Sequence, residues 1–295
     1  MIPVSKLVLG TANFGSSVSG RDAEAIIDYA LAHGITAIDT ADSYGDAEEI
    51  VGEALQGRRD SVFVSTKVGN PSPNGSGLSE KHIAEAIQHS LHRLRTDHID
   101  LYYAHNWDKN TPLTETLTAF NDVVTKGYAA ALGCSNFTAG HIKESLALAE
   151  ALGVVPFTTL QPIYNFIERG AEQEILPLAL EKRLSVWAYS PLAGGVLTGK
   201  YSYGIPRESR AVEFLNANPR EAGFIPKITE ENRAVGARVA TIAEEFGVTP
   251  SQLAIAWVLS NPAVTSVIVG VRSIPQLQGI LDSTVPQEAL EGLSL

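Results

Sequence analysis

Four polar residues in the first half of the chain have side chains that together could move a proton onto an oxygen. Asp39 and Tyr44 lie in "DTADSYG", Lys67 ends "VFVSTK" and His105 ends "IDLYYAH". A charged lysine beside a tyrosine lowers the pKa of the phenol, which is about 10 when unperturbed. Asp39 would hold Lys67 and keep it charged, and His105 could position a substrate oxygen. Such a set is suited to carbonyl reduction, in which an oxygen gains negative charge.

Each of the four residues also has a simpler interpretation when taken alone. An aspartate before a loop commonly caps a turn, and a lysine at a strand end commonly reaches solvent. A single histidine after an apolar strand is more often structural, and a single tyrosine commonly packs its ring and leaves its hydroxyl in water. The chemistry therefore depends on whether the fold brings the four together.

Short β-rich stretches alternate with helical stretches along the chain. Helical spacing follows the candidate cap Asp22 and ends at Gly34, and a second helix is expected behind Ser79. Eight stretches are apolar on both faces, as buried parallel strands are. They cover residues 7–10, 36–39, 62–67, 99–105, 129–135, 157–161, 184–190 and 265–270. Eight such units without an internal linker predict a single (β/α)8 TIM barrel over residues 1–295, rather than a doubly wound open sheet.

In a barrel of this kind the chemistry lies at the carboxyl ends of the strands. Six of the eight predicted ends are polar and would point into one shared mouth. The ends are Gly10-Thr11, Asp39, Lys67, His105, Ser135-Asn136, Gln161, Tyr189-Ser190 and Gly270. The long irregular stretch 201–227 follows the seventh strand, so we expect it to form a functional loop at the same rim.

Composition argues against several other classes of function. The formal net charge of -11 is unfavourable for binding nucleic acid or an anionic membrane. Cys134 is the single cysteine, and no stretch has the pattern of a signal peptide or a transmembrane helix, so we expect a cytoplasmic protein. We expect no metal site, because no His-x-His ends the first strand and His82, His89 and His92 fall on a helix predicted to be exposed.

Five motifs, in order, closely resemble the aldo-keto reductases from the first strand to the last helix. They are "DTADSYG", "VSTKVG", "IDLYYAH", "LGCSNF" and "VWAYSPLAGGVLTGKY". The resemblance implies a (β/α)8 barrel that binds NADPH without a Rossmann domain and reduces aldehydes or ketones. It assigns the catalytic tetrad to Asp39, Tyr44, Lys67 and His105. Tyr44 would then be the general acid, and His105 would orient the carbonyl.

The resemblance also implies a set of cofactor-binding residues. Ser135, Asn136 and Gln161 correspond to the residues that bind the nicotinamide carboxamide, and Tyr189 corresponds to the ring that stacks on the nicotinamide. Gly10, Thr11 and Asp39 belong to the same set. Trp187 shares the strand face of Tyr189 one layer deeper, so we expect it to fill the barrel.

The stretch "SPLAGGVLTGKY" nearly matches a phosphate-binding P-loop, but Tyr201 stands where a Ser or Thr would hold magnesium. As the family's loop over the cofactor pyrophosphate it fits, with Ser190, Leu192, Gly194 and Lys200 as contacts. At the adenine end the matching residues are Gly270, Arg272, Ser273 and Gln276. A guanidinium suits a 2′-phosphate, so NADPH is favoured over NADH.

The sequence departs from the family at two places. Gly279 and Ile280 occupy the region where a Glu–Asn pair is common, and "MIPVSKLVLG" reaches the first strand without the usual β-hairpin, which is reduced or missing. Either Ile2 and Val4 or another segment must then cover the bottom of the barrel.

Substrate choice should depend on residues at the mouth, with Trp107 as the expected wall. Asn106, Asp108 and Asn165 hint at hydroxylated substrates, and the oligomeric state is not predicted. The other candidates are Phe14, Tyr164 and, in the rim loop, Phe214 and Phe224.

Two other readings stay open. The chain could be a cofactor-binding regulatory protein with little turnover, like the potassium-channel β subunits of the family. It could also be an aldolase that forms a Schiff base on Lys67.

Overall fold

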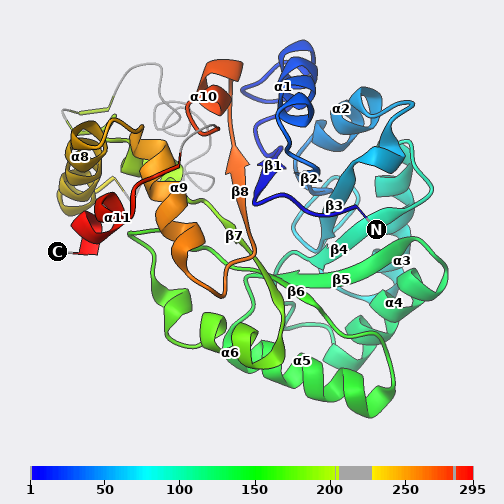
Figure 1. The fold of residues 1–295 in the computed structure, drawn as a ribbon. Helices are drawn as coiled ribbons and strands as arrows, with labels where there is room; N and C mark the ends of the chain where they lie inside the picture. The colour runs from blue at the N-terminus through cyan, green and yellow to red at the C-terminus, as the bar shows by residue number, and fades with distance from the viewer. Residues whose placement is uncertain (1, 203, 206–227, 282–283, 295) are drawn as a thin grey trace.

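A closed barrel of eight parallel strands, arranged in chain order, forms the centre of the molecule (Figure 1). The computed structural model describes residues 2–202, 204–205, 228–281 and 284–294. The predicted (β/α)8 fold is confirmed, and each strand lies within two residues of its predicted range. The strands are β1 (Leu7–Gly10), β2 (Ala37–Asp39), β3 (Phe63–Val68), β4 (Ile99–Ala104), β5 (Ala129–Ser135), β6 (Thr159–Gln161), β7 (Ser185–Tyr189) and β8 (Ser266–Gly270).

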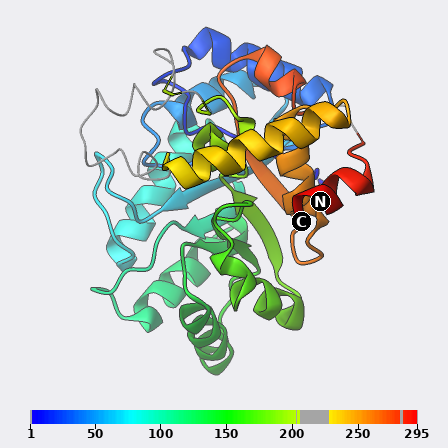
Figure 2. The ribbon, with the colours of Figure 1, turned by 90° about the vertical axis from the view of Figure 1, so that its left-hand side faces the viewer.

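Helices surround the strands in chain order, from α1 and α2 at the top of Figure 1 round to α9. The helices against the barrel are α1 (Gly20–Ala32), α2 (Ala47–Ala54), α3 (Glu80–Arg93), α4 (Leu113–Thr125), α5 (Ala139–Leu152), α6 (Ile175–Lys182) and α9 (Pro250–Ser260). Shorter or outer elements are η1 (Arg59–Ser61), η2 (Gly170–Glu172), η3 (Ala193–Thr198), α8 (Glu230–Glu245), α10 (Ile274–Gln278) and α11 (Gln287–Ser294). Figure 2 shows α8 crossing the side of the molecule, where it packs on η3 and α9.

Caps explain where two of the helices begin. Ser79 accepts a hydrogen bond from the backbone of His82 and starts α3, as predicted. The prediction of Asp22 as the cap of α1 is wrong. Ser19 is the N-cap, and Asp22 lies in the first turn, where its carboxylate accepts a hydrogen bond of 2.7 Å from Ser19 Oγ. The helix dipole favours an acidic side chain in the first turn, which explains why an aspartate occurs three residues after the true cap.

The interior of the barrel is a separate small core. Trp187 fills it, as predicted, with its ring 5.6 Å from that of Phe63 and 6.4 Å from that of Tyr103. Gly133 makes room for Tyr103, because a Cβ at this position would lie 2.4 Å from the tyrosine ring. Within the described residues, Ile2 and Val4 pack against this core from the amino-terminal side.

Strand register places the chemistry at one end of the barrel. Asp39 of β2 pairs with Gly10 of β1 and with Ser65 of β3. Lys67, two residues beyond Ser65, therefore faces inward as well, because alternate residues share a strand face. No helix in the described part of the chain is long and apolar enough to cross a membrane.

Candidate active site

A buried ion pair between Asp39 and Lys67 forms the floor of the site. Lys67 Nζ lies 2.5 Å from Asp39 Oδ2 and donates a second hydrogen bond of 2.7 Å to the Thr40 carbonyl. Asp39 Oδ1 accepts from Ser65 Oγ at 2.7 Å and from Gln161 Nε2 at 3.1 Å. Both charges are therefore paired and hydrogen-bonded, which a buried ion pair requires. Ser65 was not among the predicted site residues, although it lies two residues before Lys67 on the same strand face.

Tyr44 lies directly beside this ion pair. Lys67 Nζ is 5.0 Å from the centre of the Tyr44 ring. Burial lowers the pKa of Lys67, but the charge of Asp39, the Tyr44 side chain and hydrogen bonds to both outweigh burial, and the net pKa is raised. The lysine thus stays charged next to a phenol whose ionised form it stabilises.

His105 completes the group as a neutral imidazole. Burial, with a smaller contribution from the charge of Lys67, lowers the pKa of His105 to about 3. Its ring meets the Tyr44 ring edge-on, with centroids 5.8 Å apart, and Nδ1 is buried without a hydrogen-bond partner among the described residues. A neutral histidine at this place can donate a hydrogen bond to a substrate oxygen without competing with Tyr44 as a proton source.

A second hydrogen-bonded network continues from β5 to β7. Asn136 Nδ2 donates to the His105 carbonyl at 3.0 Å, and Tyr189 Oη donates to Asn136 Oδ1 at 2.7 Å. Ser135 Oγ donates to the Gln161 carbonyl at 2.8 Å. Burial, with the charges of Glu168 and Tyr44, raises the pKa of Tyr189 to about 12, so its phenol stays protonated and donates.

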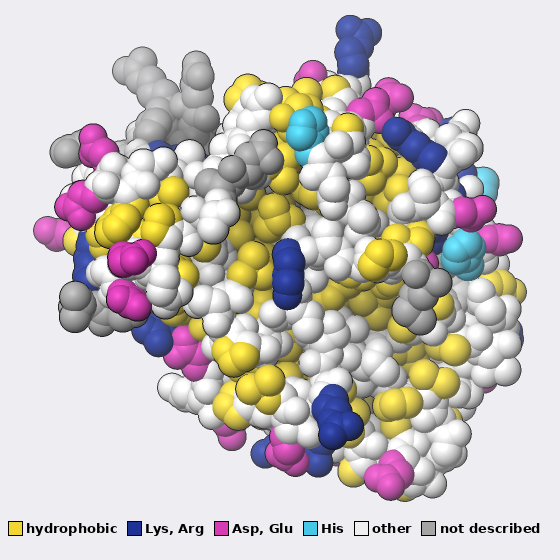
Figure 3. All heavy atoms as spheres, viewed as in Figure 1, with side chains coloured by type: hydrophobic (Ala, Val, Ile, Leu, Met, Phe, Trp, Pro, Cys, Tyr) yellow, Lys and Arg dark blue, Asp and Glu magenta, His cyan; other side chains and the backbone are white. Residues whose placement is uncertain are grey.

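A cavity of about 660 Å³ opens above the ion pair. Among the described residues, its charged lining groups are Asp39, Lys200 and Arg272, and Asp39 is paired with Lys67. Figure 3 shows the side of the molecule seen in Figure 1, on which the amino-terminal segment lies, with hydrophobic side chains set among charged ones.

The cavity brings together fourteen of the fifteen residues predicted to bind a cofactor. Ser273 is the exception. Of the predicted catalytic residues, Lys67 is buried within the floor and does not line the cavity. The predicted residues that line the cavity are Gly10, Thr11, Asp39, Ser135, Asn136, Gln161, Tyr189, Ser190, Leu192, Gly194, Lys200, Gly270, Arg272 and Gln276. Its volume lies within the range of about 300–1,000 Å³ that is usual for ligand and cofactor sites.

Glycines give the loop after β7 its shape. Gly194 and Gly195 have φ angles of +67° and +93°, a region that favours glycine. The end of the Lys200 side chain lies over Gly195, where a Cβ would be 2.5 Å from Nζ. The loop thus presents backbone and a lysine ammonium to the cavity, a suitable donor set for phosphate oxygens.

Comparison with known proteins agrees with this geometry. The sequence model of the aldo/keto reductase family matches residues 6–289. The chain belongs to the aldo/keto reductase family. It is 40% identical over 287 residues to a probable voltage-gated potassium channel subunit beta of Arabidopsis thaliana. The aligned region covers 94% of this chain and 86% of that protein.

Further relatives of this aldo/keto reductase have similar coverage. A probable voltage-gated potassium channel subunit beta of Oryza sativa subsp. japonica is 40% identical over 284 residues, 93% of this chain and 85% of its own length. The uncharacterized oxidoreductase YrpG of Bacillus subtilis (strain 168) is 38% identical over 291 residues, 93% of this chain and 86% of its own. The family supports an oxidoreductase.

The end of the cavity near Arg272 and Gln276 includes residues that were not predicted to line it. Thr249 and Ser251 at the start of α9 line it together with Gly279 and Ile280. Thr249 Oγ1 donates to the Gly279 carbonyl at 2.6 Å and so joins α9 to α10. No local pattern marks these residues, because α9 reaches the cavity only through the packing of the last helices.

Three polar residues proposed for substrate binding serve instead to join loops. Asn106 donates to Asn70 Oδ1. Asp108 Oδ2 accepts from the Leu78 backbone at 2.8 Å and from Thr111 Oγ1 at 2.7 Å. Asn165 is fully buried. The hint of a hydroxylated substrate therefore loses its support.

The aromatic candidates for the substrate wall also have packing roles. Trp107 lies outside the residues that line the cavity, and its indole stacks on His141 with centroids 3.8 Å apart. Phe14 and Tyr164 are buried. Residues 206–227 of the rim loop, with Phe214 and Phe224, lie outside the described residues.

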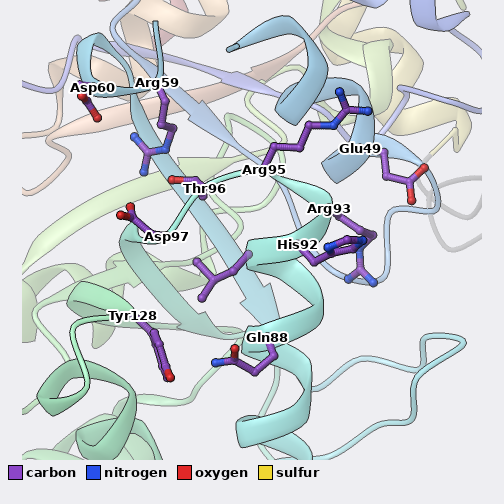
Figure 4. A pocket seen from close by; sticks show the side chains of 11 residues that line it. Glu49, Arg59, Asp60, Gln88, His92, Arg93, Arg95, Thr96, Asp97 and Tyr128 are labelled. Carbon is purple, nitrogen blue, oxygen red and sulfur yellow. The ribbon is translucent and has the colours of Figure 1, made fainter. Parts of the chain in front are cut away.

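A larger hollow of about 1120 Å³ lies on another part of the surface (Figure 4). Its lining includes Arg59, Arg93 and Arg95, and each is paired with a carboxylate. The pairs are Arg59–Asp100, Arg93–Glu48 and Arg95–Glu53. With these cations already paired and no carboxyl end of a strand among its lining residues, this hollow offers no comparable chemistry.

The histidines of α3 differ in part from the expectation. His82 was expected to be exposed, but its side chain is buried, with 8% of its surface accessible. Within the part of the chain that the structure describes, no three His, Cys, Asp or Glu side chains gather into a group that could hold a metal ion.

Proposed function

We propose that this protein is an NADPH-dependent oxidoreductase that reduces an aldehyde or ketone to an alcohol, with Tyr44 as general acid. The observation that carries the proposal is the buried Asp39–Lys67 pair beside Tyr44 at the floor of the cavity. A permanently charged lysine stabilises the phenolate that remains after the tyrosine has donated its proton.

Each residue of the group has a defined part in this reaction. NADPH, when bound, supplies the hydride that adds to the carbonyl carbon. Tyr44 donates its proton to the carbonyl oxygen, and Lys67 stabilises the resulting charge. His105, neutral because of burial, donates a hydrogen bond that orients the same oxygen. Asp39 holds Lys67 in place.

The residues that line the cavity have the chemical groups needed to bind the nicotinamide ring and the phosphates of NADPH. Tyr189 offers a ring, and the 190–200 loop offers backbone groups and Lys200. Arg272 could bind a 2′-phosphate, and its backbone N–H donates to Gln276 Oε1 at 2.9 Å, which connects the two residues at this end. These contacts favour NADPH over NADH.

A titration of intrinsic fluorescence with NADPH and, separately, with NADH tests the proposal without a known substrate. Saturable binding of NADPH and weaker binding of NADH are expected, followed by NADPH oxidation with some members of an aldehyde and ketone panel. Equal binding would remove the role of Arg272. No binding of either nucleotide would refute the proposal.

A second candidate function is regulation with little turnover. It is favoured by the plant relatives, which are named as probable voltage-gated potassium channel β subunits. NADPH binding without oxidation by any carbonyl of the panel would favour this candidate. The Schiff-base alternative has less support, since Lys67 is 0% exposed and its pKa is raised, whereas an amine nucleophile must be neutral and accessible.

A further inference from the structure

Asn165 uses its whole side-chain amide to join two loops. Nδ2 donates to the Ser190 carbonyl at 3.0 Å and to Glu168 Oε2 at 2.9 Å. Oδ1 accepts from the backbone N–H groups of Ile167 and Glu168 at 3.0 and 2.8 Å. Asn165 is 0% exposed, so its own amide group is shielded from water.

The partner of Asn165 lies in the most constrained part of the cavity wall. Ser190 has a φ of +56° and Ala193 a φ of +47°, in the left-handed region that residues other than glycine rarely adopt. The Ser190 carbonyl also accepts from the Ala193 backbone N–H at 3.0 Å, which closes a turn. Such a backbone persists only where surrounding contacts hold it.

The neighbouring backbone strengthens this connection. The Tyr164 N–H donates to the Tyr189 carbonyl at 3.3 Å, and Ile163 forms a β-bridge with Tyr189. Successive residues of the β6–α6 loop therefore hold successive residues at the end of β7. Tyr189, Ser190 and Leu192 line the cavity, whereas Asn165 does not.

We propose that Asn165 is a positioning residue that holds Ser190 and the 190–193 turn in the conformation that receives the cofactor. This inference rests on the proposed function, since it concerns the same cavity. Asn165 touches the wall of the site from behind and acts only through Ser190.

Asn165→Asp is the most selective test. The aspartate can still accept from Ile167 and Glu168, but it cannot donate to Ser190. Loss of one of the two hydrogen bonds to the Ser190 carbonyl should weaken NADPH binding roughly 2- to 10-fold. The KM for NADPH should rise to the same extent, while kcat at saturating cofactor should change little.

Two further variants separate positioning from general stability. In Asn165→Asp/Glu168→Gln the new glutamine amide can donate to the aspartate, which restores the loop but not the bond to Ser190. NADPH binding should remain weak even if thermal stability recovers. Asn261→Ser is the matched control, because Asn261 Nδ2 donates to Tyr164 Oη at 3.3 Å and so supports the same loop without touching Ser190.

Hydrogen exchange of the Ala193 amide in cofactor-free protein gives a readout independent of NADPH. Exchange should be faster in both Asn165 variants and unchanged in Asn261→Ser. Unchanged exchange, wild-type affinity in Asn165→Asp, or recovery of affinity in the double variant would overturn the inference. Failure of the wild type to bind NADPH would refute the proposed function, and Ala193 exchange would still decide the role of Asn165.

Discussion

Lys67 Nζ lies 2.5 Å from Asp39 Oδ2, and the two side chains are 0% and 3% exposed. The aspartate is further bound by Ser65 and Gln161, and the lysine by the Thr40 carbonyl. The ion pair is thus a part of the core as well as a part of the site. Its removal should affect both folding and chemistry.

Removal of one partner should be strongly destabilising. Lys67→Met leaves a buried carboxylate without its cation, which typically costs about 3–5 kcal/mol of unfolding free energy. In the double variant Asp39→Asn/Lys67→Met no charge is left unpaired, so denaturant unfolding should show partial recovery. Arg95→Met, which removes an ion pair that is about half exposed, should cost at most about 1 kcal/mol. A double variant no more stable than Lys67→Met would contradict this account.

Tyr44→Phe should abolish reduction while leaving NADPH binding nearly intact. Loss of a positioned general acid lowers rates by about 10²–10⁴-fold, and the phenylalanine ring keeps the packing against His105. Steady-state rates and a fluorescence titration measure the two effects separately. Tyr29→Phe on α1 is a control remote from the cavity. Parallel loss of binding and turnover would mean that Tyr44 has no distinct acid role.

His105 should make the protein sensitive to acid. Its folded-state pKa of about 3 lies below its usual value near 6.5, so the unfolded chain binds the proton more readily. Stability is therefore lost as pH falls below 6.5 towards 3. Between pH 7 and pH 5 the wild type should lose about 2 kcal/mol relative to His105→Gln, because the other groups titrate in the same way in both proteins. Equal pH dependence in the two proteins would show that His105 takes up a proton as readily in the folded protein as in the unfolded chain.

Asp42 should have the opposite dependence on pH. It is 4% exposed, so its carboxylate is shielded from water. Burial, followed by the charge of Glu48, raises the pKa of Asp42 to about 7, although the charge of Arg93, a hydrogen bond from the Ser43 backbone and the charge of Lys67 oppose this. The Tyr102 hydroxyl has no hydrogen-bond partner among the described residues, and it lies close enough to Asp42 and Glu48 for their charges to raise its pKa.

The raised pKa means that the unfolded chain loses its proton first as pH rises. The destabilisation by Asp42 therefore grows between pH 4 and pH 7 and is complete above pH 7. Asp42→Asn should match the wild type at pH 4 and be about 2–4 kcal/mol more stable at pH 8. Asp46→Asn, at an exposed position of the same loop, is the control. Equal stability of wild type and Asp42→Asn at pH 8 would show that Asp42 ionises freely in the fold.

The barrel and most of the candidate site could be predicted from the amino-acid sequence. Alternation within each strand decides which residues face inward, and the polar ends of parallel strands meet at one rim. For that reason Asp39, Lys67 and His105 could be predicted to lie together. The resemblance to the family likewise predicted a loop at "SPLAGGVLTGKY", and its residues Ser190, Leu192, Gly194 and Lys200 line the cavity.

The roles of the remaining polar groups depend on contacts that form when the chain folds. Asn165 and Asp108 are polar residues near strand ends, as binding residues are. In the folded chain they form hydrogen bonds with loops distant in sequence, at Ser190 and Leu78 respectively. Thr249 reaches the cavity because α9 packs beside α10. A hydrogen bond between segments 25 or 30 residues apart leaves no periodic trace in the sequence, so its partners become known only when the chain has folded.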